Sequence, residues 1–235
     1  VQATTMTNSG AGVLDYTAAM TGITAISAGG SVTIGGANGG AINNTGTAGT
    51  GVVTFKTHAA DQTGTIGVTG GKEFASINAT STGGTTAFSA AIAATDINIT
   101  GTGDTTFGAA VTGNVNMITP GASGDLQQVV NVAITGNVTT SVTNTGELTL
   151  APETTTATVV RVLGNIGTSD LKLKIVSVGG TANNKIAKIS GNIFATNINI
   201  LNTSATTATT IINGDMDGIV SFTGGATNSG ILSLT

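Results

Sequence analysis

The fold is decided by one segment and its near-copy, FSAAIAATDINIT at residues 88–100 and FGAAVTGNVNMIT at residues 107–119. Aligning their Phe residues at an offset of 19 places Ile92 on Val111 without a gap. A shift of one position instead pairs INI with VNM, so no single offset fits the whole unit. Self-similarity at a period of this size is the signature of a repeat architecture. The segments therefore predict stacked units joined by turns of slightly variable length.

A second repeat, Gly-Asn followed by Val or Ile, runs through the C-terminal half as TGNV, TGNV, LGNI and SGNI. Its Gly residues are 23, 28 and 27 positions apart. We expect Gly to supply a left-handed or bulged backbone, Asn to bond the backbone or stack on the next Asn, and the β-branched residue to restart a strand. The motif predicts structural corners at Gly113, Asn114, Gly136, Asn137, Gly164, Asn165, Gly191 and Asn192.

Short alternating runs lie between these corners. Apolar and polar residues alternate with period two, which is typical of half-buried strands. The runs are SVTI (31–34), VVTF (52–55), INIT (97–100), ELTL (147–150), LKLKIVSV (171–178), INIL (198–201) and ILSL (231–234). No amphipathic helix is expected, although DLQQVVNVAI from Asp125 is compatible with a single helical turn.

The pattern predicts an all-β fold, a right-handed parallel β-solenoid of roughly ten coils that forms one domain over residues 1–235. Irregularities are expected near residues 119–128 and 150–157. Phe107, Val111 and Met117, together with Val115, are expected to form the inward stack of one coil. A β-sandwich is the alternative, but it does not readily explain repeated corners, and it normally brings Trp or Tyr. This chain has no Trp and one Tyr.

Charged residues make up only 8% of the chain, and Gly accounts for 36 of 235 residues. Stacked Thr and Asn carry no repulsion between coils, whereas stacked like charges do, so a solenoid explains the low charge. With 7 Lys and Arg and a net charge of −4, we expect no nucleic-acid partner. Five of these cations share one segment and are interpreted as a solvated face: Arg161, Lys172, Lys174, Lys185 and Lys188.

The absence of Cys excludes disulfides and thiolate metal sites. No run of about 18 apolar residues occurs, so no membrane-spanning helix is expected. The opening VQATTMTNSG lacks the basic start and apolar core of a signal peptide, so if the protein is secreted we expect this chain to be a processed form or an excised fragment.

The segments SGNIFATNINI, TGNVNMIT and TGNVTTSV, in a Cys-free chain rich in Thr, Asn and Gly, resemble the passenger regions of bacterial autotransporters. The similarity is greatest to the large rickettsial-type surface antigens of the outer-membrane protein B type. It covers about residues 60–235, most clearly 100–215. The resemblance implies an extracellular β-helical rod at the bacterial cell surface, where it serves in adhesion or in a protein coat. The family's signal peptide and membrane barrel are not in this sequence.

The residues that could carry chemistry are few. His58, the single histidine, is followed by Asp61, but no G-x-S-x-G nucleophile turn occurs, so we interpret His58 as a loop residue. DMDG at residues 215–218 resembles the start of a calcium loop but lacks the later ligands, so it is interpreted as a plain turn. The Gly-rich stretches at residues 35–40 and 83–88 lack the Lys-Ser/Thr of a phosphate loop. We predict no catalytic residue, no cofactor and no metal.

The acids lie singly along the chain: Asp61, Glu73, Asp96, Asp104, Asp125 and Asp170 among them. Stacked coils could still bring distant acids together, so a polysaccharide-active β-helix enzyme is a remote alternative.

The final residues SGILSLT follow a strand pattern without a polar cap. Solenoids normally close their terminal coils, because open strand edges template further pairing. We therefore expect either the continuation of a longer rod or self-association, end to end or lateral. The function predicted is a non-enzymatic structural or adhesive protein of the bacterial surface, which could bind a host-cell or matrix receptor. The alternative is a self-assembling subunit of an extracellular filament or surface layer.

Overall fold

The fold was analysed in a computed structural model, which describes residues 5–17, 19–27, 29–56, 61–80, 84–120, 125–129, 133–151, 159–179, 186–202, 209–224 and 231–235. Strands dominate the described residues, and the one helical element among them is a short 3-10 turn, η1 (Thr69–Gly71). The strands within these ranges pair in parallel, as β9 does with its neighbours β7 and β11. The predicted all-β class is confirmed.

The described strands form three sheets. The longest has the order β2 (Val13–Tyr16), β4 (Ser31–Ile34), β6 (Val52–Phe55), β7 (Phe74–Thr80), β9 (Ile92–Gly101), β11 (Val111–Pro120), β13 (Ala133–Ile134), β16 (Val159–Val162), β18 (Ile186–Ile189), β20 (Thr209–Ile212) and β22 (Ile231–Leu234), with β14 (Val138–Thr140) paired to β11. The second has the order β21 (Met216–Gly224), β19 (Ile193–Asn202), β17 (Leu173–Val178), β15 (Thr145–Ala151), β12 (Asp125–Val129), β10 (Thr105–Phe107) and β8 (Thr86–Phe88). The third contains β1 (Thr5–Asn8), β3 (Ile23–Ile26) and β5 (Ile42–Asn44).

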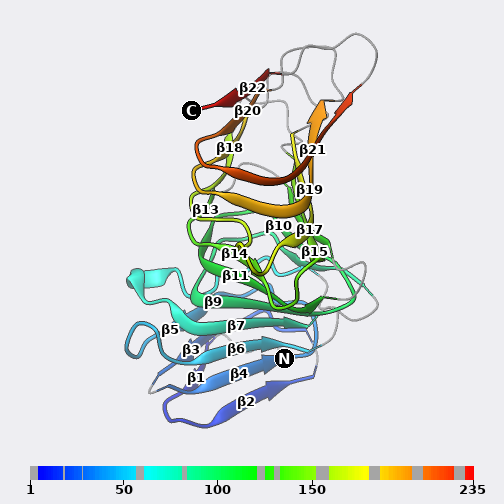
Figure 1. Ribbon diagram of the computed structural model, residues 1–235. Helices are drawn as coiled ribbons and strands as arrows, with labels where there is room; N and C mark the ends of the chain where they lie inside the picture. The colour runs from blue at the N-terminus through cyan, green and yellow to red at the C-terminus, as the bar shows by residue number, and fades with distance from the viewer. Residues whose placement is uncertain are drawn as a thin grey trace.

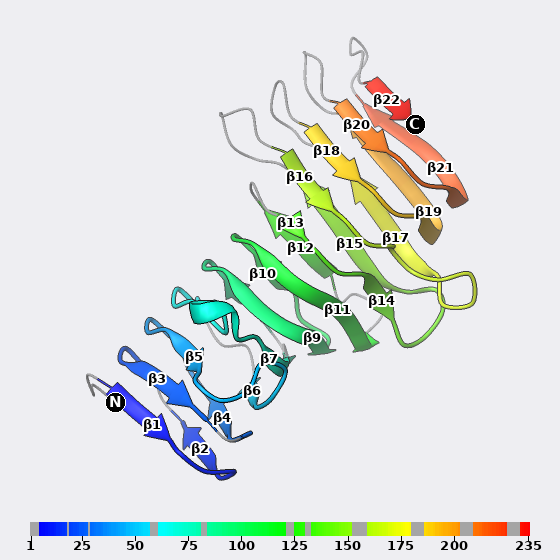
Figure 2. The same ribbon diagram turned by 90° about the vertical axis from the view of Figure 1, so that its left-hand side faces the viewer.

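The chain winds as a right-handed parallel solenoid of about eight turns. In Figure 1 the strands β19 and β21 run left to right across the front, and the chain returns behind them to the next level. Figure 2 shows β16, β18, β20 and β22 side by side on the neighbouring face. The expected ten or so coils is slightly too many. The corner glycines are 23, 28 and 27 residues apart, and coils of this length give fewer turns in 235 residues than coils of about 20 residues do.

The repeat that predicted the fold stacks directly on itself. Phe107 pairs with Phe88 and Val111 with Ile92, as the gapless alignment of the two segments requires. Beyond a register shift after Thr112 the offset falls by one position, so that INI lies against VNM. The shift is a bulge at the corner, where one coil has one residue more than the next. The expected variation in turn length is confirmed.

The interior of the solenoid is a continuous apolar core. The four residues expected to point inward, Phe107, Val111, Val115 and Met117, are buried. Aromatic rings stack along the axis: Phe88 packs edge-on against Phe55 and face to face against Phe107, with the ring centroids 5.4 and 5.6 Å apart. Aromatic pairs at this spacing stabilise a core beyond the area that they bury.

One local expectation is wrong. Asp125–Val129 forms strand β12, which pairs with β10 and β15, and makes no helical turn. Two flanking parallel strands satisfy its backbone groups, and this tertiary pairing overrides the weak helical pattern. Of the irregular segments expected near 119–128 and 150–157, residues 121–124 and 152–157 lie outside the described residues.

Candidate functional site

The predicted corners form one column along the solenoid. The Oδ1 atom of Asn114 accepts a hydrogen bond from the backbone N–H of Asn137 at 3.1 Å. The same contact recurs on the next two turns. Oδ1 of Asn137 accepts from the N–H of Asn165, and Oδ1 of Asn165 accepts from the N–H of Asn192, each at 2.8 Å. Asn192 in turn accepts from the N–H of Asp215 at 2.9 Å. We call this column, Asn114, Asn137, Asn165, Asn192 and Asp215, the corner ladder.

Asp215 is the member that sequence reasoning missed. It follows Gly214 and stands 23 positions after Asn192, so the spacing continued the series. The signal was obscured because Asp replaces Asn and Met216 replaces the β-branched residue. DMDG is thus the uppermost corner of the ladder among the described residues. A cavity of about 490 Å³ lies beside this corner, lined by Asn213, Gly214, Asp215, Met216, Leu234 and Thr235.

The corner glycines are required for a reason other than the expected one. A Cβ on Gly164, Gly191 or Gly214 would lie 2.5 Å from the carbonyl oxygen of the corner glycine one turn below. Gly136 is similarly obstructed by the carbonyl of Gly113. Within the set only Gly113 has a positive φ, +125°, at the register shift. Close approach of successive coils therefore selects glycine at this corner, and a left-handed backbone is the exception.

A second polar column crosses the longest sheet on strands β7, β9, β11 and β14. The Nδ2 of Asn98 donates to Oδ1 of Asn78 at 3.0 Å, and Asn116 donates to Asn98 at 3.1 Å. Thr139 donates through Oγ1 to Asn116 at 2.9 Å. Asn116 also donates to the carboxylate of Asp96, at 3.1 Å. Asp96 is thus held by an amide contact from the next coil.

The cations that the sequence groups into one segment have different environments. Lys172 forms an ion pair with Asp217 and Lys174 with Glu147, each at 2.6 Å between Nζ and a carboxylate oxygen. Arg161 and Lys188 are instead register partners on the adjacent strands β16 and β18. Lys185 lies outside the described residues. The interpretation as one solvated face is therefore too simple, because two of the cations bridge coils and two others stand side by side.

Of the other candidates for chemistry, two are bound by side chains of other coils and one is not described. His58 lies outside the described residues. Asp61 accepts a hydrogen bond from Ser89 at 2.8 Å, and Asp217 belongs to the ion pair with Lys172. Within the described ranges, no three His, Cys, Asp or Glu side chains lie close enough together to hold a metal ion. Those ranges also contain no helix long and apolar enough to cross a membrane.

The arrangement can hold coils together and can present side chains to large molecules. Its corners and columns donate and accept hydrogen bonds between turns, and its outer face carries the Arg161–Lys188 pair. No known protein family, curated protein or solved structure matches the chain.

Proposed function

We propose that this protein is a non-enzymatic structural or adhesive rod of the bacterial cell surface, of the autotransporter passenger type. The observation that carries the proposal is that the repeated polar side chains form hydrogen bonds between coils. The corner ladder and the column from Asn78 to Thr139 use amide and hydroxyl groups to join one coil to the next. Polar residues used in this way hold the solenoid in a fixed shape. A coat protein or an adhesive rod depends on such a shape.

Two further points support the proposal. Glu147 binds a lysine, Asp96 an amide and Asp61 a hydroxyl, which favours a structural role for these carboxylates. The resemblance of the Gly-Asn corners to passenger regions suggests export to the bacterial surface. A Thr- and Asn-rich exterior of low charge also offers a large hydrogen-bonding surface to a receptor or to a neighbouring rod.

Surface location is tested on intact cells of the source bacterium. We expect an antibody against residues 1–235 to label intact cells, and added protease to remove the signal without lysis. A cytoplasmic protein of the same cells should stay unlabelled and undigested. Labelling that requires permeabilised cells would contradict the proposal. Loss of attachment to host cells or matrix on deletion of the gene would then separate adhesion from a purely coat-forming role.

A second candidate, a self-assembling subunit, is favoured by the upper end of the described solenoid. Val220, Phe222 and Leu234 lie in register above Ile198, Ile200 and Ile212, which are buried. The upper three are 37%, 65% and 59% exposed. A further coil would bury them, whether it comes from a second copy or from more of the same chain.

Sedimentation over a range of concentrations tests self-assembly. If copies stack through this end, the chain forms larger species as concentration rises, and Phe222→Ser lowers their proportion. Val142→Ser is the matched control, because Val142 is 50% exposed but lies in a bend away from this end. A strictly monomeric chain at high concentration would contradict assembly by the isolated segment and leave the surface rod as the proposed function.

A further inference from the structure

We propose that the outer face of β16 and β18 binds an acidic polysaccharide, with Arg161 and Lys188 together holding one of its carboxylate or sulfate groups. The proposal gives a ligand class to the adhesive role proposed above and rests on that role for its place at the cell surface. We call this surface, formed by Arg161, Lys188, Asn165 and Asn192, the basic corner face.

The two cations are placed together by the register of the solenoid. Arg161 pairs with Lys188, so their backbones lie one strand spacing apart, about 4.8 Å. Val162 and Ile189, the residues that follow them, are buried in the core, so the two cationic side chains point outward. Arg161 is exposed and Lys188 is half-buried. Like charges directly opposite each other on neighbouring strands repel, so the pair destabilises the fold unless a negative charge lies near it.

Three other lysines of the described chain show how such a counter-charge is supplied. Lys56, Lys172 and Lys174 each lie 2.6 to 2.7 Å from a carboxylate oxygen of another coil. Among the residues that the structure describes, no acid forms an ion pair with Arg161 or Lys188. An oxyanion placed between them would convert the repulsion into two charge-assisted hydrogen bonds, and the planar guanidinium suits a carboxylate or sulfate group.

The neighbouring corners supply neutral donors. Asn165 and Asn192 follow Arg161 and Lys188 along the chain, and the corner ladder uses only the Oδ1 atom of each of these two side chains. No described residue accepts a hydrogen bond from the Nδ2 group of either Asn. Each of the two coils therefore carries one amide donor at the corner that follows its cation. Sugar hydroxyl oxygens are suitable acceptors for such donors.

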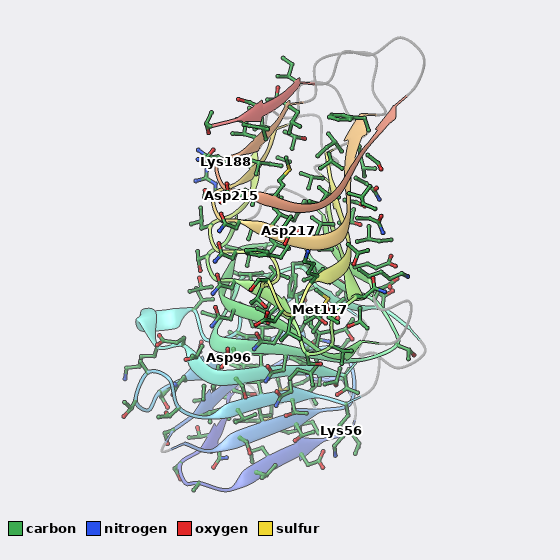
Figure 3. All side chains as sticks on the ribbon, in the orientation of Figure 1. Lys56, Asp96, Met117, Lys188, Asp215 and Asp217 are labelled. Carbon is green, nitrogen blue, oxygen red and sulfur yellow. The ribbon has the colours of Figure 1, made fainter. Side chains whose placement is uncertain are left out.

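Charge density favours a polysaccharide over a nucleic acid. Duplex DNA carries one charge per about 1.7 Å, and binding it requires many cations. The basic corner face has two, on a chain of net charge −4, and Asp215 stands one coil above Asn192. Figure 3 shows Lys188 and Asp215 on the same side of the solenoid. A polymer with widely spaced carboxylate or sulfate groups can place one group on the cation pair and keep its others away from Asp215.

The test measures binding of the purified chain to immobilised dextran sulfate of low substitution, whose sulfate groups are several sugars apart, with neutral dextran of the same length as the reference surface. We expect binding to dextran sulfate alone, and binding that weakens as salt is raised. The double variant Arg161→Gln/Lys188→Gln should bind about tenfold more weakly. Arg161→Lys keeps the charge but loses the planar guanidinium, so it should bind more weakly than the wild type and more tightly than the double variant. Far-UV circular dichroism and the thermal midpoint establish that each variant is folded.

The matched control is Lys56→Gln/Lys72→Gln, which removes the same charge from exposed positions on other coils. If both double variants lose affinity equally, the effect is one of net charge and the basic corner face is not a site. The inference is also overturned if the wild-type chain fails to bind dextran sulfate at low ionic strength, or if duplex DNA binds more tightly. If the antibody against the chain labels intact cells but any of these binding results is obtained, the proposed surface role stands and only the proposed polysaccharide ligand is wrong.

Discussion

The side-chain oxygen of Asn165 accepts a hydrogen bond from the backbone N–H of Asn192 at 2.8 Å, although the two residues are 27 positions apart. The same contact recurs along the corner ladder as far as Asp215 in the described residues. A side-chain oxygen of one coil thus serves as the hydrogen-bond acceptor for a backbone N–H of the next coil. The Gly-Asn motif repeats in the sequence because this contact repeats in the structure.

Removing one rung should weaken the solenoid. Asn165→Ala leaves the N–H of Asn192 to water, and we expect the free energy of unfolding to fall by about 0.5–1.5 kcal/mol. Asn165→Asp keeps an oxygen acceptor at the same place and should retain most of that stability. Urea denaturation of the two variants measures the difference. Equal losses for Ala and Asp would show that the hydrogen bond is not what stabilises the corner.

Gly164→Ala should be more damaging than an ordinary glycine substitution. The added Cβ would meet the carbonyl oxygen of Gly136 at 2.5 Å, so the coils would have to separate. We expect a loss of about 1–3 kcal/mol in the free energy of unfolding. Gly12→Ala is the control, because nothing lies within 4 Å of its Cβ position, and its effect should stay within about 0.5 kcal/mol. Indistinguishable results for the two variants would contradict the close approach.

The aromatic stack should account for a large part of the core's stability. Phe88 is 1% exposed and contacts the rings of both Phe55 and Phe107. Phe88→Ala is expected to lower the free energy of unfolding by about 3–5 kcal/mol. The same substitution at Phe222, which is 65% exposed, should cost far less when measured in the same denaturation experiment. A small effect at Phe88 would mean that the ring is not in the core.

Tyr16 reports on the first coils directly, because it is the single tyrosine and the chain has no Trp. Partial burial raises the pKa of its phenol above the ordinary value of 10.0. Since the folded state prefers the neutral phenol, the contribution of Tyr16 to stability is complete below the unfolded-state pKa and declines as the pH rises through the folded-state pKa. The ultraviolet absorbance of the phenolate follows the titration. We expect a higher midpoint in buffer than in urea, and identical midpoints would contradict the burial.

Much of the fold is predictable from the sequence because a half-buried strand leaves a period-two pattern. The runs at 31–34, 52–55 and 231–234 coincide with β4, β6 and β22. A strand as short as Thr86–Phe88 shows too little alternation to be recognised. The Gly-Asn corners are visible because close approach of successive coils selects Gly and the coil-to-coil hydrogen bond selects Asn at four of them.

The arrangement of residues in the outer columns is much harder to predict. The offset between stacked residues differs from coil to coil, as the pairs Val115–Ile97 and Lys188–Arg161 show. Each loop length changes which side chains of neighbouring coils meet. The sequence shows that cations are close together along the chain, but only the register shows that Arg161 and Lys188 are neighbours while Lys172 reaches Asp217 two turns away.

The stacking of coils is tested most directly by one distance along the solenoid axis. The outward column Thr33, Thr54, Asn78, Asn98, Asn116 and Thr139 is continuous in register. Five steps of about 4.8 Å place its ends about 24 Å apart. Because the chain contains no Cys, spin labels can be attached at Thr33→Cys and Thr139→Cys alone and their separation measured by pulsed electron resonance. A narrow peak within about 5 Å of that distance is the predicted result, and a broad distribution or a peak beyond about 35 Å would contradict the stacked solenoid.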